Sequence, residues 1–180
     1  MAGALLEGKH AGKSPELEAY RKAIRAGRAG SYWFVALVGL RSHDPLDVLK
    51  RVEKGLAFSA LEHFQRNSGL STSDLAEAVV IKLRTLHRRK EQGRLEPEES
   101  DRLLRVSRVF GRALELFEGN AEAARQWLAT EQTALGGERP MVLAKTAGRP
   151  PREIAAQLAE GLRAAPGIVA VEIAGPGFLN

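Results

Sequence analysis

The chain has 180 residues, 44% of them hydrophobic and 27% charged, so it is long enough for one domain with a small appendage and can bury a core. Its 27 lysines and arginines exceed its 22 acidic residues, and the net charge of +5 suits a polyanionic partner without requiring one. The absence of cysteine excludes disulfide scaffolds, thiolate zinc sites and cysteine catalysis.

The N-terminal part is rich in glycine, alanine and basic residues and has weak periodicity. We expect residues 1–40 to form a mobile basic arm and an apolar segment, with room for a short helix after Pro15. The longest apolar run, residues 31–40, is shorter than the ~20 residues of a membrane span. The N-terminus also lacks the order of a secretory signal. These features predict a cytoplasmic protein without a membrane segment.

The next segments have the start and stop signals of helices. Asp44 followed by Pro45 is typical of a helix start, and Gly55 of a stop. A second helix is expected to begin at Ser59 and to end at Gly69. The apolar positions expected along these two helices are Leu46, Leu49, Val52, Leu61 and Phe64.

The strongest helix pattern begins at Pro97 and continues to Gly119. A shorter helix is expected to follow. The inward positions predicted for the two helices are Leu103, Val106, Phe110, Ala113 and Phe117, then Ala124, Trp127 and Leu128. No convincing strand precedes Thr130, so the sequence predicts an all-α helical bundle.

Residues 71–93 fit a helix-turn-helix. Ser71 and Asp74 have capping-box spacing at the start of a first helix over residues 72–80. A second helix is expected over residues 83–91, before Gly93. Leu75, Ala76 and Val79 are expected to face inward, with Ile81 in the turn and Leu83 and Leu86 on the inner face of the second helix.

The outer face of that second helix carries long hydrogen-bond donors. Arg84, His87, Arg88 and Glu91 follow at i, i+3, i+4 and i+7, and either arginine can bind guanine O6 and N7 in a bidentate manner. A solvated charged helix remains the simpler interpretation. The other residues expected to contact DNA are Ser71, Thr72, Lys82, Thr85, Arg89 and Lys90.

The last forty residues differ in character and predict a helix-strand appendage over residues 141–180. Ile154, Leu158 and Leu162 form one stripe of a helix, and the alternation up to Ile173 is typical of a strand. A single strand needs a partner, and the preceding 130 residues offer none. We therefore expect the segment to be a fragment or to pair with another chain.

No pattern of catalytic or metal-binding residues stands out. The four histidines are scattered at His10, His43, His63 and His87, without metal-ligand spacing. The segment "LGGERP" lacks the ending of a phosphate loop and predicts a turn. We therefore expect neither an enzyme nor a bound metal or cofactor.

Residues 40–140 carry a series of motifs that resembles the Xre/MbcA/ParS-type antitoxins of RES-Xre toxin–antitoxin systems. The motifs are R-T-L-x-R-R, G-R-L-x-x-x-E-S-x-R-L, A-x-x-L-F, A-x-x-W-L and A-L-G-G-x-x-P, in the order of that family. The resemblance implies an antitoxin that forms a homodimer, binds its operator, and neutralises a RES-domain toxin that degrades NAD. It also implies that residues 41–118 bind DNA and dimerise, and that toxin binding begins within residues 119–140.

After Pro140 the chain instead resembles a fragment of the N-terminal domain of arginyl-tRNA synthetase, in "LAKTAGRPPREIA" and "VEIAGPGFLN". This segment stands where the antitoxins carry their toxin-blocking helix. The resemblance to the antitoxins implies toxin contacts at Arg139, Lys145, Arg149, Arg152 and Glu153. Two other functions stay open: a module that holds a toxin without binding DNA, and tRNA contact by the C-terminal segment.

Overall fold

We describe a computed structural model of the chain that covers residues 14–27, 33–142, 173–174 and 178–179. The chain divides into two compact units, residues 1–125 and residues 126–180. The elements in chain order are α1 (Pro15–Arg25), η1 (Trp33–Val38), α2 (Pro45–Glu53), α3 (Phe58–Ser68), α4 (Thr72–Ala78), α5 (Leu83–Gln92), α6 (Pro97–Leu116), α7 (Ala121–Ala129), η2 (Thr133–Leu135), β1 (Ile173–Ala174) and β2 (Phe178–Leu179). The body is helical, as the sequence predicted.

The core of the first unit is built around η1, a 3-10 helix that contacts α1, α3 and α6. Its apolar run is buried inside the unit, with Val35 and Leu37 fully enclosed. Beside it, the rings of Phe64 and Phe110 meet edge to face at 5.9 Å, which is a favourable geometry for two aromatic quadrupoles. Residues 33–38 of the apolar segment that is too short for a membrane therefore lie at the centre of the core. Among the described residues, no helix is long and apolar enough to cross a bilayer.

Helix α1 packs on this core. Ser14 caps it by accepting a hydrogen bond from the Leu17 amide at 3.0 Å, and Leu17 and Tyr20 are almost fully buried. Ser14 also donates to the side chain of Asn67 on α3, whose amide nitrogen donates to the Leu37 carbonyl at 2.8 Å. The helix predicted after Pro15 is confirmed, but the expectation of a mobile arm is wrong for residues 14–27.

The start of α2 agrees with the prediction, whereas the start of α3 does not. Asp44 caps α2 by accepting from the Leu46 amide at 2.8 Å, as expected. Helix α3 begins at Phe58, so the predicted start at Ser59 is wrong. The cause is a non-local contact: the Phe58 amide donates to the Gly93 carbonyl at 2.9 Å, which fixes the helix start ahead of the serine.

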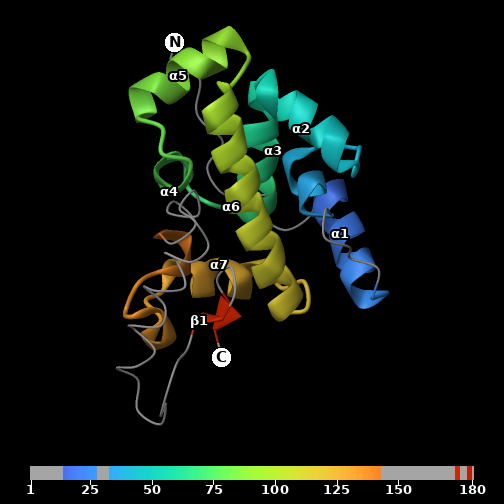
Figure 1. Ribbon diagram of the computed structural model, residues 1–180, viewed down its shortest axis with the longest axis vertical. Helices are drawn as coiled ribbons and strands as arrows, with labels where there is room; N and C mark the ends of the chain where they lie inside the picture. Colours follow the sequence, from blue (N-terminus) through green and yellow to red (C-terminus); the bar gives the residue numbers. More distant parts are fainter. Residues whose placement is uncertain (1–13, 28–32, 143–172, 175–177, 180) are drawn as a thin grey trace. The chain divides into compact units, whose positions relative to one another are not determined.

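Helix α6 is the long axis against which the other helices of the first unit pack. In Figure 1, α4 and α5 lie to its left and α2 and α3 to its right, and α2, α3 and α4 all contact it. It starts with a capping box in which Glu99 accepts from the Glu96 amide at 2.9 Å. The start of α6 lies beside α5, and an ion pair between Arg89 and Glu99 joins the two helices.

The second unit contains the end of α7, the short η2 helix and a small hairpin. Gly136 and Gly137 both have positive φ after η2, which confirms the turn predicted for this segment. In the hairpin, Ile173 pairs with Leu179 in antiparallel register. The expectation of a partner from another chain is therefore wrong for Ile173, because its partner strand follows a few residues later. The helix predicted at Ile154, Leu158 and Leu162 lies outside the described residues.

Candidate nucleic-acid interface

Helices α4 and α5 form the expected helix-turn-helix. Ser71 caps α4 by accepting from the Asp74 amide at 3.1 Å, and its hydroxyl donates to the Asp74 carboxylate at 2.6 Å. Gly93 ends α5 in the left-handed conformation, with φ 70°. The apolar residues that brace the pair are all buried, namely Leu75, Ala76, Val79, Ile81 and Leu86. The two helices therefore pack on each other and on the body through these residues, and the other side of α5 faces solvent.

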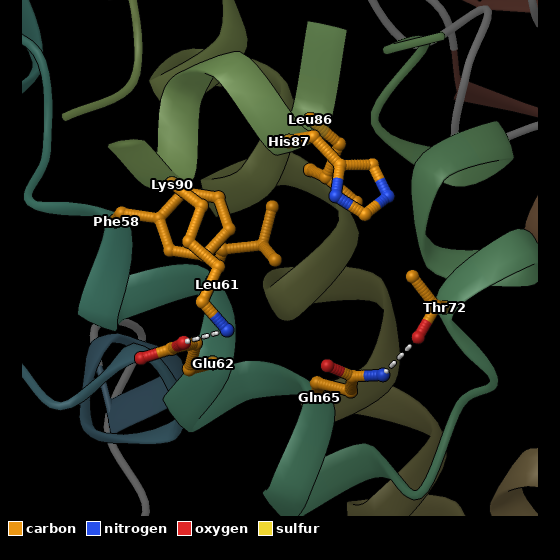
Figure 2. A pocket seen from close by; sticks show the side chains of 8 residues that line it. All are labelled: Phe58, Leu61, Glu62, Gln65, Thr72, Leu86, His87 and Lys90. Atoms are coloured by element: carbon orange, nitrogen blue, oxygen red, sulfur yellow. Dashed lines mark hydrogen bonds and ion pairs between the residues drawn. The ribbon is translucent and has the colours of Figure 1, made fainter. Parts of the chain in front are cut away.

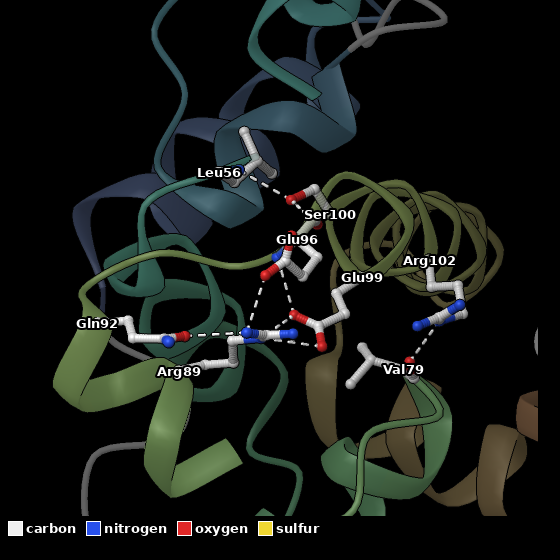
Figure 3. Close-up of polar contacts among 8 residues, drawn as sticks. All are labelled: Leu56, Val79, Arg89, Gln92, Glu96, Glu99, Ser100 and Arg102. Carbon is white, nitrogen blue, oxygen red and sulfur yellow. Dashed lines mark hydrogen bonds and ion pairs between the residues drawn. The ribbon is translucent and has the colours of Figure 1, made fainter. Parts of the chain in front are cut away.

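The turn between the two helices is held from both sides. The Ile81 amide donates to the Ala76 carbonyl at 2.8 Å, which closes the turn from within. The guanidinium of Arg102 on α6 donates to the Val79 carbonyl at 2.7 Å (Figure 3). Between these contacts, Val80 has φ 56°, a left-handed conformation that is costly for a β-branched residue.

The inner face of α5 carries Arg89, which is buried. Its Nε donates to the Glu99 carboxylate at 2.8 and 3.1 Å, and its Nη1 lies 2.9 Å from both Gln92 Oε1 and Glu96 Oε1 (Figure 3). The bond to Glu99 raises the pKa of the Arg89 guanidinium above its already high usual value, so this side chain stays charged. The prediction that Arg89 contacts DNA is wrong, because this cation joins α5 to α6.

The side chain of Leu83 points outward. It is 50% exposed, whereas the sequence predicted it on the inner face beside Leu86. The buried residues of α5 are Leu86 and Arg89, which are three positions apart. The face that α5 turns to the body therefore runs from Leu86 toward Arg89, and Leu83 lies outside it.

The outward face of α5 is basic. Lys82, Arg84, His87 and Arg88 are exposed, as is the acidic Glu91. Within the described part of the chain, the three long cations among them have no hydrogen-bond or ion-pair partner. Arg84 and Arg88 are four residues apart and therefore project from the same side of the helix.

The remaining residues predicted to contact DNA are partly engaged elsewhere. Thr72 is half-buried and accepts from the Gln65 side chain at 2.9 Å. Lys90 is exposed but lies 3.5 Å from the Glu62 carboxylate. Thr85 is half-buried, and Ser71 is exposed while its hydroxyl caps α4. The free cationic surface is therefore smaller than the sequence suggested, and it is concentrated at Lys82, Arg84 and Arg88.

A shallow pocket lies between α3 and the helix-turn-helix (Figure 2). Phe58, Leu61 and Leu86 form its apolar part. The Lys90–Glu62 ion pair and the Gln65–Thr72 hydrogen bond stand at its sides. The ion pair joins α5 to α3 and the hydrogen bond joins α4 to α3, so each helix of the helix-turn-helix has a polar contact with α3.

Of the residues that the resemblance assigned to toxin contact, Arg139 is exposed near the end of the described segment. The other four, Lys145, Arg149, Arg152 and Glu153, lie outside the described residues. Among the described residues, no group of three or more histidine and carboxylate side chains is placed to hold a metal ion.

Sequence reasoning missed two features of this interface. One is the role of Arg102, which holds the turn from another helix and has no local signal. The other is the exposure of Val80 and Leu83 at the turn, 56% and 50% respectively. The sequence carried no signal for the conformation of Val80, because a turn that needs a positive φ usually carries glycine and this one carries valine.

Comparison with known proteins agrees with this geometry. Residues 47–108 match the family described as the antitoxin Xre-like helix-turn-helix domain, and residues 138–180 match the arginyl-tRNA synthetase N-terminal domain. "Antitoxin Xre" of Yersinia enterocolitica is 28% identical over 110 residues, which are 61% of this chain and 74% of that protein.

The C-terminal match is to a different class of protein. "Arginine--tRNA ligase" of Cereibacter sphaeroides is 65% identical over 40 residues, and that of Paracoccus denitrificans is 62% identical over 40 residues. These segments are 22% of this chain and only 7% of either ligase. The chain is therefore similar to antitoxin Xre, with residues 47–108 matching the antitoxin Xre-like helix-turn-helix domain and residues 138–180 matching the N-terminal domain of arginyl-tRNA synthetase.

Proposed function

We propose that the chain is an antitoxin that acts as a homodimer, represses its own operon by sequence-specific binding through α4 and α5, and neutralises a RES-domain toxin that degrades NAD. The observation that carries the DNA-binding part is the exposed pair Arg84 and Arg88 on a helix whose other side is buried. A recognition helix requires this division, because the buried side fixes its orientation while the donors reach base edges.

The chemistry of the two arginines suits a guanine-containing site. Each planar guanidinium offers two parallel N–H donors to guanine O6 and N7 in the major groove. Lys82 supplies a compact cation for a phosphate next to them. Glu91 on the same face disfavours nearby phosphates, so we place the phosphate contacts at the N-terminal end of α5, beside Lys82.

The test uses duplex DNA from upstream of the reading frame and the full chain in electrophoretic shift and fluorescence anisotropy titrations. Arg84→Ala and Arg88→Ala are each expected to lose about 1–3 kcal/mol of binding free energy. Arg108→Ala is the matched control, because Arg108 is an exposed arginine on α6 outside the helix-turn-helix. Unchanged affinity in both α5 variants would count against DNA reading by this face.

A salt titration separates the proposal from a module that holds a toxin without binding DNA. Binding through phosphates must weaken steeply as salt rises, because each phosphate contact releases counterions. If the chain binds toxin but shows no salt-dependent binding to any DNA duplex, it holds a toxin without binding DNA.

The toxin-binding part rests on the similarity to antitoxin Xre and on the resemblance of the motifs up to Pro140. Co-expression of the full chain with a RES-domain toxin is expected to restore growth and cellular NAD. Double substitution Arg152→Ala and Glu153→Ala tests whether the C-terminal segment takes part. Growth arrest that persists with wild-type chain would contradict neutralisation, and a light-scattering mass of one chain would contradict the dimer.

A further inference from the structure

Val80 combines backbone strain with exposure. Its φ of 56° lies in the left-handed region, which glycine adopts without penalty and a β-branched side chain adopts at a cost. Its side chain is 56% exposed, so burial within the described residues does not compensate for this strain. Strained residues of this kind are found at binding sites, where the surroundings use the side chain.

Leu83 is a second large apolar side chain exposed on the same segment. It is the first residue of α5 and lies three positions after Val80. The exposed cations Lys82 and Arg84 flank it in the chain. An apolar protein partner would have to cover these two cations or pair them with acid, whereas DNA would place phosphates around them.

We infer that Leu83, together with Val80, contacts the 5-methyl group of a thymine in the major groove. The inference rests on the proposed function, in which α5 reads that groove. Thymine is the only base that presents an apolar group there, and the first residues of a recognition helix contact base edges. The site read by this chain therefore contains a thymine next to the guanine bound by Arg84.

The first experiment compares thymine with uracil, which differs only by the methyl group. Duplexes are selected from a random-sequence library on the full wild-type chain, and the best one is resynthesised with deoxyuridine at each thymine in turn. At the contacted position, wild-type affinity is expected to fall about fourfold, the value of one buried carbon group. Leu83→Ala is expected to bind both duplexes equally well.

Leu46→Ala is the matched control, because Leu46 is a leucine on α2 with 67% exposure. It should keep the full preference for thymine. Equal binding of thymine and uracil duplexes by wild type would overturn the inference, as would a preference that persists in Leu83→Ala. If the wild-type chain selects no duplex from the library, the proposed DNA-binding function itself fails.

The second experiment uses Val80→Gly and measures two properties of the same variant. Relief of the left-handed strain is expected to raise the Tm by about 2–4 °C. Loss of the side chain is expected to lower affinity for the thymine duplex two- to fourfold. A residue with only a structural role would not separate the two, so a higher Tm with unchanged affinity would remove Val80 from the contact.

Discussion

Arg89 on α5 and Glu99 on α6 form a two-point ion pair, with Nε of the arginine 2.8 and 3.1 Å from the two carboxylate oxygens. Both side chains are at least nine-tenths buried, and Glu99 also accepts from the Glu96 amide in the capping box of α6. The helix cap of α6 and the orientation of α5 therefore depend on the same carboxylate. We therefore expect a change at this pair to disturb the position of α5 while leaving the residues of its outer face in place.

The neighbours Arg88 and Arg89 should behave in opposite ways when each is replaced by alanine. Arg89→Ala leaves a buried carboxylate without its cation and is expected to lose about 2 kcal/mol or more of unfolding free energy. Arg88→Ala removes an exposed side chain and should change that free energy by less than about 0.5 kcal/mol. Urea denaturation followed by circular dichroism measures both, and equal stabilities would contradict the structural role of Arg89.

These two arginines also mark what the sequence could predict. The helix-turn-helix follows from local signals, because Ser71, Gly93 and the apolar spacing act within one turn of where they stand. The burial of Arg89 depends on Glu99 in the next helix. The sequence alone does not distinguish an arginine that is buried in an ion pair from one that is exposed to solvent. The sequence therefore gives the motif but overestimates its cationic surface.

Two other errors have the same origin. Leu83 and Leu86 are the only leucines of a ten-residue helix, so their spacing allows an inner face on either side of Leu86. The packing of α1 depends on contacts such as the one from Tyr20 to Glu115, which are 95 positions apart. A local sequence pattern does not reveal contacts over such a distance. The weak periodicity of residues 14–27 therefore led to the prediction of a mobile arm.

A phosphate contact by Lys82 would be visible in the salt dependence of DNA binding. Lys82→Ala is expected to reduce the slope of log K against log salt by about 0.9 and to weaken binding to different sequences equally. Lys50→Ala is the control, since Lys50 is an exposed lysine on α2. Identical slopes for wild type and Lys82→Ala would show that this cation makes no phosphate contact.

Gly55 is required for the close approach of two loops. Its φ is 78°, and a Cβ at this position would clash with the Leu95 carbonyl oxygen. Gly93 has a similar φ of 70° but open space around it. Gly93→Ala should therefore cost about 1 kcal/mol from backbone strain alone, while Gly55→Ala should cost at least about 2 kcal/mol more. Equal losses in urea denaturation would contradict the clash.

The buried phenol of Tyr20 should make stability fall at alkaline pH. Burial, and then the 2.9 Å hydrogen bond that its hydroxyl donates to Glu115 Oε1, raise the pKa of Tyr20 well above its usual value of about 10. Below pH 10 both the folded and the unfolded chain keep this proton, so the stabilisation is fully present. Above pH 10 the unfolded chain releases the proton first, which favours unfolding by up to about 1.4 kcal/mol per pH unit.

Tyr20→Phe isolates this effect from the titration of other groups. At pH 8 the variant should be less stable by about 1 kcal/mol, because it lacks the bond to Glu115. Between pH 10 and 11 the deficit should shrink, since phenylalanine has no proton to lose and the wild-type chain alone is weakened. Urea denaturation at half-unit steps of pH measures the two curves. Parallel curves would mean that the Tyr20 phenol ionises as readily in the folded chain as in the unfolded one, and its buried bond to Glu115 would then have no influence on the proton.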